Sequence, residues 1–242
     1  MKRSERPFTQ IPRPLLAGFV FILLLQLVVH QLSLLPDAND YQPLSAPFSA
    51  STYRSLAMGS DHLLSYLLAI RLQLHDNQAG KHVRYERMDY AVLVRWLEQI
   101  DQLNTNSEYP MMLAARVYSQ VNDQQRLRVI IDYVQTQFAK NPQLHWRRQA
   151  EAIVIAKHRL GDLTLALALA EQLSNQPAHI VMPQWARDMQ FLILAELNEF
   201  ETGIALITAL LQSGSIADAD EKRFLKAKLL EFQQKLLESR QK

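Results

Sequence analysis

Cysteine is absent from this 242-residue sequence, and glycine is scarce, with six residues in the whole chain. Without cysteine there are no disulfides, no thiolate metal ligands and no cysteine nucleophile. Few glycines, together with many Leu, Ala, Gln and Glu residues, favour helices joined by short turns. No run alternates polar and apolar residues for long enough to indicate a strand. We therefore predict an all-α fold.

Motifs of known catalytic chemistry are missing as well. Gly80-Lys81 lacks the earlier Gly and the following Ser or Thr of a phosphate-binding loop, no two His residues have a metal-binding helical spacing, and no Ser lies in a GxSxG sequence. Glu151 follows His145 and Trp146 on one predicted helix, but helical proteins of this size place such residues together by chance. We expect no enzyme, no catalytic residue, no cofactor and no metal.

Charge of one sign is concentrated only at the N-terminus. Residues 1–13 hold four of the 26 basic residues and one of the 24 acidic residues, so the rest of the chain is close to neutral. Because phosphate binding needs a concentrated basic surface, we expect no nucleic acid partner.

A long uncharged stretch, PLLAGFVFILLLQLVVHQLSLLP, runs from Pro14 to Pro36. A helix of this length covers about 35 Å, enough to cross the hydrocarbon core of a bilayer. Basic residues precede the stretch, and the next one, Arg54, lies well downstream. The sequence therefore predicts a cytoplasmic head (1–13), a transmembrane helix (14–36) and a chain that continues on the far side of the membrane.

Two alternatives explain this stretch less well. A cleaved secretory signal needs small residues one and three positions before the cut, whereas Phe48-Ser49-Ala50 and Leu44-Ser45-Ala46 place a large residue there. A buried helix of a soluble domain leaves the charge asymmetry unexplained.

Polar residues inside the predicted span share one face. Gln26, His30 and Ser33 follow one another at i, i+4 and i+7. Such a face contacts a partner helix or a wet cavity, or else these residues lie near the end of the span and reach the headgroups.

Helical periodicity begins after a predicted extended linker (37–52) that contains Pro43 and Pro47. Residues 60–74 carry an unusually wide apolar face, which predicts a helix covered on more than one side. Asp89 precedes a helix whose apolar stripe is Leu93, Trp96, Leu97, Ile100 and Leu103, and Pro110 fits the first turn of the next helix.

The helices recur at a regular interval. Asp123, Asp162 and Glu199 begin helices at spacings of 39 and 37 residues, and Trp146 and Trp185 are 39 residues apart. Helix pairs that return at such an interval indicate an α-solenoid of antiparallel helix pairs over residues 53–215.

The turns between these helices resemble tetratricopeptide repeats. Gly161-Asp162-Leu163, followed by Ala166, matches that family's turn and small packing residue, and Asn198-Glu199-Phe200 with Gly203 matches it more loosely. The resemblance implies a TPR-like repeat domain that binds protein partners. A single span followed by such repeats also resembles uncharacterised inner-membrane proteins of proteobacteria and periplasmic partners of the translocon.

The last segment (216–242) combines a mixed-charge surface with a stripe of Leu225, Leu229, Phe232 and Leu236. The stripe favours a terminal helix that closes the repeat array, with a membrane-surface helix as the alternative.

Two groups of residues are candidate binding surfaces. One is a basic helix with the residues Trp146, Arg147, Arg148, Lys157 and Arg159. This helix either binds a carboxylate or an acidic peptide, or is a solvated face with Trp146 in the core. The other is an aromatic group that serves packing more than ligand binding; its residues are Tyr85, Tyr90, Trp96, Tyr109 and Tyr118.

These features together predict a single-pass protein of a bacterial inner membrane whose C-terminal domain lies in the periplasm. We expect an adaptor or scaffold that binds membrane or periplasmic proteins and assists the assembly of an envelope complex. The alternative is a permanent structural subunit of a respiratory or secretory complex.

Overall fold

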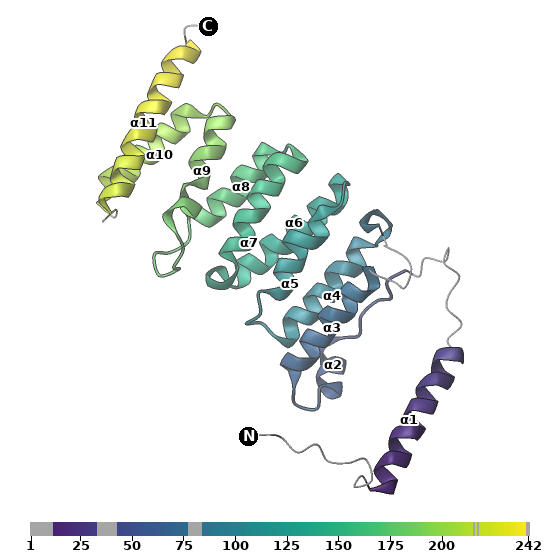
Figure 1. Ribbon diagram of the computed structural model, residues 1–242. Coiled ribbons are helices and arrows are strands. Elements are labelled where there is room, and N and C mark those ends of the chain that lie inside the picture. Colours follow the sequence, from purple (N-terminus) through teal and green to yellow (C-terminus); the bar gives the residue numbers. More distant parts are fainter. Residues whose placement is uncertain (1–11, 33–42, 77–83, 215, 217, 241–242) are drawn as a thin grey trace, which may run out of the picture. The chain divides into compact units, whose positions relative to one another are not determined.

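The computed structural model describes residues 12–32, 43–76, 84–214, 216 and 218–240, and all regular structure within these ranges is helical (Figure 1). The all-α prediction is confirmed for this part of the chain. Two compact units divide the chain after Gln42. The helices are α1 (Arg13–Leu32), α2 (Ala50–Leu56), α3 (Asp61–Asp76), α4 (Tyr90–Leu103), α5 (Tyr109–Met112), α6 (Gln124–Lys140), α7 (Pro142–Ile155), α8 (Leu163–Ser174), α9 (Gln184–Glu196), α10 (Phe200–Gln212) and α11 (Ala219–Arg240).

Helix α1 is the described element of the first unit. Its large hydrophobic side chains from Leu15 to Val28 are exposed, and because they are nearly consecutive they occur all round the helix. Within the described residues, no helix is both long and apolar enough to cross a membrane. The predicted head up to residue 11, positions 33–36 of the predicted span and positions 37–42 of the predicted linker lie outside the described residues.

The helices of the second unit are arranged in chain order, and each long helix packs against the next one (Figure 1). Contacts also join alternate helices: α7 touches α5 on one side and α9 on the other, while α4 touches α6. In the pairing that the sequence predicts, α5, α7 and α9 are the first helices and α4, α6, α8 and α10 the second helices, and these first helices contact one another.

An aspartate directly precedes each of the helices α4, α6 and α8, as the sequence predicts. The side chains of Asp89, Asp123 and Asp162 each accept a hydrogen bond from a backbone N–H two or three residues later. These bonds satisfy N–H groups that have no partner within the helix. Glu199 stands at the same position before α10 but makes no such bond.

The stripe predicted on α4 is buried in the core. It also fixes the end of the linker, because the Trp96 indole N–H donates to the backbone oxygen of Ser45 at 2.7 Å. Helix α2 begins at Ala50, so the linker ends earlier than the predicted residue 52. The segment that follows residue 42 is therefore attached to the second unit.

The expectation that residues 60–74 are covered on several sides is wrong. Leu68 and Leu72 are buried, whereas the side chains of Leu63, Leu67 and Leu74 are more than half exposed. Helix α3 packs against α2 and α4 and contacts Tyr109 of α5 through Tyr66 and Gln73, but these contacts leave the three leucines exposed.

Two first helices end in wider turns than the sequence suggests. After α5, in which Pro110 occupies the first turn as predicted, the chain continues through the π turn η3 (Leu113–Val117) and the 3-10 turn η4 (Tyr118–Gln120). Helix α7 likewise ends in the π turn η5 (Ala156–Leu160). Gly161 follows with φ of 65°, a left-handed conformation that glycine adopts without strain.

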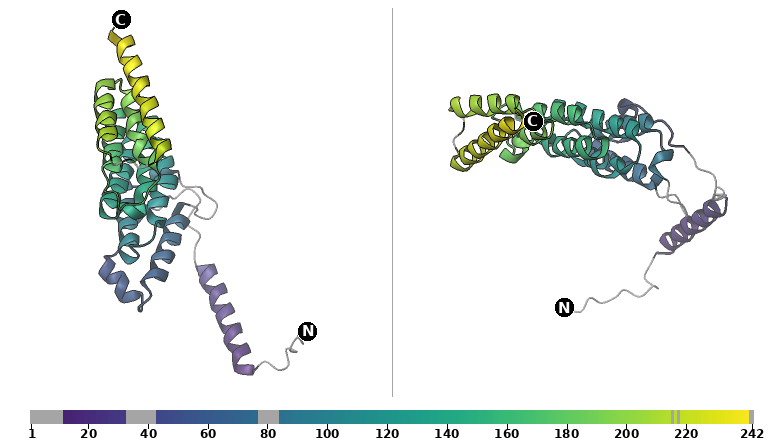
Figure 2. Two further views of the ribbon diagram at one scale, coloured as in Figure 1. Left: turned by 90° about the vertical axis from the view of Figure 1, so that its left-hand side faces the viewer. Right: turned by 90° about the horizontal axis from the view of Figure 1, so that it is seen from above.

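Helix α11 lies beside α10 at the end of the row, and Figure 2 shows the two from further directions. Leu225 and Phe232 of its predicted stripe are fully buried, and Leu229 and Leu236 pack against the same cluster. The stripe is therefore buried against α9 and α10.

Candidate functional site

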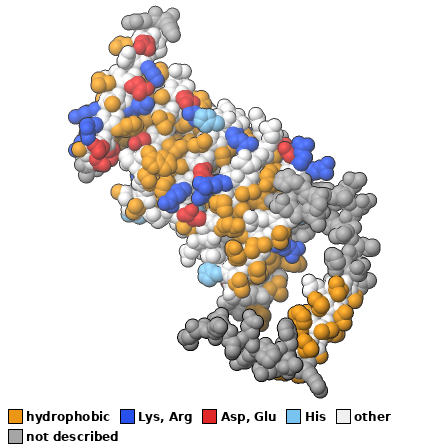
Figure 3. Space-filling model, in the orientation of Figure 1, with side chains coloured by type: hydrophobic (Ala, Val, Ile, Leu, Met, Phe, Trp, Pro, Cys, Tyr) orange, Lys and Arg blue, Asp and Glu red, His pale blue; other side chains and the backbone are white. Residues whose placement is uncertain are grey.

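A cavity of about 510 Å³ is lined by the turns η3 and η4 that follow α5, by α7 with η5, and by α9. Figure 3 shows basic and acidic side chains gathered at the place of α7, with hydrophobic side chains over α5 and α9 on either side. The volume lies in the range of sites for small ligands or for a few side chains of a bound peptide. We call this cavity the A-groove.

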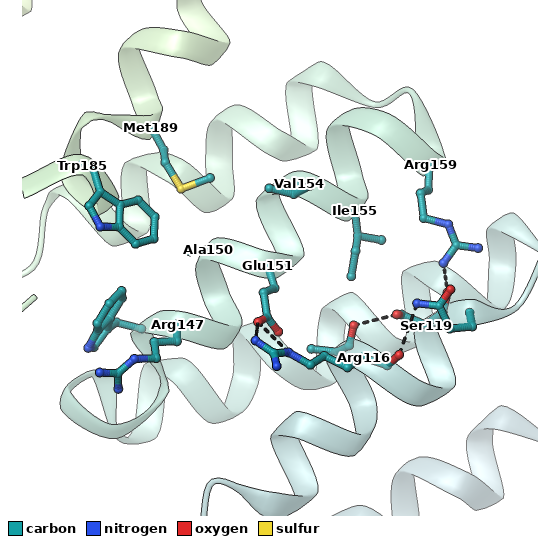
Figure 4. A pocket seen from close by; sticks show the side chains of 13 residues that line it. Arg116, Ser119, Arg147, Ala150, Glu151, Val154, Ile155, Arg159, Trp185 and Met189 are labelled. Atoms are coloured by element: carbon teal, nitrogen blue, oxygen red, sulfur yellow. Dashed lines mark hydrogen bonds and ion pairs between the residues drawn. The ribbon is translucent and has the colours of Figure 1, made fainter. Parts of the chain in front are cut away.

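A shared carboxylate lies at the centre of the A-groove. Glu151 Oε1 accepts hydrogen bonds from Arg116 Nε at 2.9 Å and Arg116 Nη2 at 2.6 Å (Figure 4). It also accepts one from Arg148 Nη1 at 2.6 Å. Burial works to raise the pKa of Glu151, but the hydrogen bonds from both guanidinium groups outweigh it and lower that pKa below its ordinary value. Glu151 is therefore ionised at neutral pH, and Arg116 links α7 to the preceding helix pair.

The charges around this carboxylate do not balance. Glu108 lies 3.7 Å from Arg147 and 3.6 Å from Arg148, so two carboxylates serve Arg116, Arg147 and Arg148. Arg148 is almost completely buried, while the side chains of Arg116 and Arg147 are more than half exposed. The exposed edge of the A-groove is therefore positively charged.

Aromatic side chains form one end of the A-groove. The rings of Trp146 and Trp185 meet edge to face with centroids 5.8 Å apart, and the guanidinium carbon of Arg147 lies 4.6 Å from the Trp146 ring centre. Trp146 is buried, but Trp185 is 56% exposed and lies beside Met189 (Figure 4). Tryptophan and arginine are among the residues most enriched at the energetic centres of protein interfaces.

The opposite end is held by Arg159. Its guanidinium donates to the backbone oxygen of Ser119 and, at 2.8 Å, to that of Val121. These carbonyls belong to the end of the preceding first helix and have no partner further along it. Arg159 thus joins the end of α7 to the segment that follows α5, through both terminal nitrogens of its guanidinium.

Three of the five predicted binding residues line the A-groove, namely Trp146, Arg147 and Arg159. Arg148 does not line the groove but forms ion pairs with Glu151, which does, and with Glu108. Lys157 does not line it and pairs with Glu196 of α9. The basic helix is therefore neither a simple solvated face nor a uniform binding surface, because its residues divide between the groove and contacts between helix pairs.

Most residues that line the A-groove were not predicted from the sequence. The residues that were not predicted come from η3, η4, α7 and α9, and they are Arg116, Ser119, Gln120, Val154, Trp185 and Met189. One signal was present in the sequence, since the 39-residue spacing of Trp146 and Trp185 predicts equivalent positions in neighbouring pairs. Equivalent positions on adjacent first helices lie side by side, which is how the two rings meet.

The polar residues of the predicted span are only partly described. Gln26 is exposed on α1, His30 lies on the same helix four residues later, and Ser33 falls outside the described residues. The aromatic group is mainly a packing group: Tyr90, Trp96 and Tyr118 are buried, and the Tyr90 hydroxyl donates to the Tyr118 backbone oxygen at 2.7 Å.

Among the described residues, no three His, Asp or Glu side chains lie together as metal ligands would. Comparisons with protein-family models, with curated proteins and with solved structures find no match.

Proposed function

We propose that the chain is a membrane-anchored adaptor of the bacterial inner membrane. In this proposal α1 belongs to a single transmembrane helix with a cytoplasmic N-terminus, residues 53–215 form a TPR-like α-solenoid in the periplasm, and residues 216–242 close its end. The A-groove binds protein partners and thereby assists the assembly or organisation of an envelope complex.

Support for the anchor comes from the uncharged stretch Pro14 to Pro36 of the sequence and from exposure. Helix α1 covers this stretch as far as Leu32 and by itself falls short of a spanning helix, so the proposal rests on the whole stretch. Its hydrophobic side chains from Leu15 to Val28 are exposed all round, and lipid is the environment that covers such a surface without a second protein.

Support for the solenoid comes from the contacts of α7 with both α5 and α9. Stacked helix pairs expose a long surface for each residue used, and attachment to a membrane raises the local concentration of that surface near other membrane proteins.

The A-groove carries the functional proposal. Exposed Arg116 and Arg147 attract a carboxylate, while Trp185, Met189 and Val154 offer apolar contact beside them. A partner segment with an acidic residue next to a large apolar side chain satisfies both parts. We therefore propose such a peptide segment as the ligand.

The groove is tested by co-purification in mild detergent from cells that produce wild type, Arg147→Glu or Trp185→Ala. Both side chains are more than half exposed, and the Arg147 ion pair with Glu108 is a surface pair worth about 0–1 kcal/mol, so both variants retain the fold. Arg95→Glu, an equal charge change at an exposed position of α4, is the control.

An adaptor loses its partner in both groove variants and keeps it in the control. A partner retained by all three variants contradicts the groove and favours a permanently built-in subunit of a respiratory or secretory complex. Topology is tested separately with alkaline phosphatase fused after Lys242. The fusion is active when the domain is periplasmic, and an inactive fusion reverses the proposed orientation.

A further inference from the structure

A second cavity, of about 520 Å³, lies under the loop between α8 and α9. Its walls come from that loop, from α9 and α10, and from Ile216 and Glu221. We call it the loop cavity. It does not overlap the A-groove, and its apolar wall consists of Ile180, Val181, Met182, Phe191, Leu206 and Leu210.

Arg187 organises the roof of the loop cavity. Its Nη1 donates to the backbone oxygens of Ser174 at 3.1 Å and Gln176 at 2.6 Å, and its Nη2 donates to those of Pro177 at 3.3 Å and Ile180 at 3.2 Å. The guanidinium therefore folds the loop over the cavity. Its end nitrogens serve carbonyl groups, and no carboxylate pairs with it among the described residues.

Two carboxylates face this cavity without a cationic partner. Asp188 is 8% exposed, and its side chain accepts a hydrogen bond from the neutral Gln184 amide at 3.1 Å. Glu221 lines the cavity from the start of α11, and neither acid forms an ion pair within the described part of the chain. A buried carboxylate is ordinarily paired with a cation, so Asp188 lacks the partner that its burial calls for.

The surroundings raise the pKa of both carboxyl groups above their ordinary values. Burial raises the pKa of Asp188 to about 6, the Gln184 hydrogen bond lowers it and the charge of Glu221 adds to the rise. Burial also raises the pKa of Glu221, as does Asp218, while Arg187 acts in the opposite direction.

We propose that the loop cavity binds an organic cation with an apolar body, a primary amine or a guanidinium whose positive group pairs with Asp188. The apolar wall receives the hydrocarbon part, and Gln184 keeps the carboxylate oriented. A concave apolar site with few convergent polar groups is the usual form of a small-ligand site. This site is independent of the partner proposed for the A-groove.

The test is calorimetric titration of the full chain in detergent with cyclohexylmethylamine and with its uncharged counterpart cyclohexylmethanol. Asp188→Asn removes the charge while keeping the shape and the Gln184 contact. Asp132→Asn, the same change at an exposed position of α6, is the control and also reports any partition of the amine into detergent.

We expect the amine to bind wild type and the Asp132→Asn control equally, and Asp188→Asn at least tenfold more weakly. We also expect amine binding to strengthen from pH 5 to pH 7.5 in wild type, as the Asp188 carboxyl group ionises, and to lose this dependence in Asp188→Asn. The proposal is overturned if the amine does not bind wild type, if the alcohol binds as tightly, or if Asp188→Asn binds like the control.

Discussion

Gly203 of α10 allows α11 to dock, and Gly203→Ala is the sharpest test of that contact. A Cβ atom at this position would lie well within 3.0 Å of two atoms of the Phe232 ring, a separation that real Cβ atoms essentially never show. The ring is fully buried in the cluster that joins α9, α10 and α11, so it cannot move aside into solvent.

Two effects of opposite sign decide the magnitude. Alanine in place of glycine in a helix interior stabilises by about 1 kcal/mol. Overpacking a well-filled core destabilises by about 1–3 kcal/mol. Because the overlap with the Phe232 ring is severe, we expect overpacking to prevail and Gly203→Ala to lower the unfolding free energy by about 1 kcal/mol.

Urea unfolding followed by circular dichroism measures this change, and hydrogen exchange of the α11 amides shows whether the loss is local to α10 and α11. Phe232→Leu supplies the control, because a smaller side chain leaves room for the new methyl group. The double variant should lose about 1 kcal/mol less than the two single losses combined. Gly203→Ala as stable as wild type, with no coupling to Phe232→Leu, would refute the packing argument.

Two further predictions concern acids in defined environments. Burial raises the pKa of Asp101 to about 6, so the folded state binds this proton more tightly than the unfolded chain does. The free energy of unfolding therefore falls as the pH rises from about 4 to about 7. In urea titrations, Asp101→Asn should be about as stable as wild type at pH 4 and more stable by about 2 kcal/mol at pH 7.5. Asp162→Ala should cost about 1 kcal/mol in the same assay, because it removes the capping bond of α8 and the ion pair with Arg128. Glu199→Ala, at the equivalent position without a capping bond, should cost less, and equal losses would contradict the role given to the cap.

The sequence was sufficient to locate most helices because their signals are local. A capping aspartate, a proline in the first turn or a glycine after the last turn acts within a few residues, and the α4 stripe depends only on helical spacing. Asp162 and Gly161 therefore lie where the sequence places them.

The composition of the groove was not predictable in the same way. Arg116 and Glu151 are 35 residues apart, and whether they meet depends on how adjacent helix pairs slide against each other. The π turn that contains Arg116 has no sequence signal, because Leu, Ala and Arg suit an α turn equally well. The contacts of Lys157 and Arg159 were not predictable for the same reason, because their partners lie on other helices or the segments that follow them.

The π turns of η3 and η5 also bear on where the length of the chain can change. A π turn accommodates one residue more than the α turn it replaces, so losing one residue from Ala156–Leu160 restores ordinary winding and leaves the flanking segments in phase. The same loss in the middle of α6 rotates everything beyond it by about 100° and turns a buried stripe towards solvent. These two joints are therefore the places in the first helices where a single-codon deletion is tolerated.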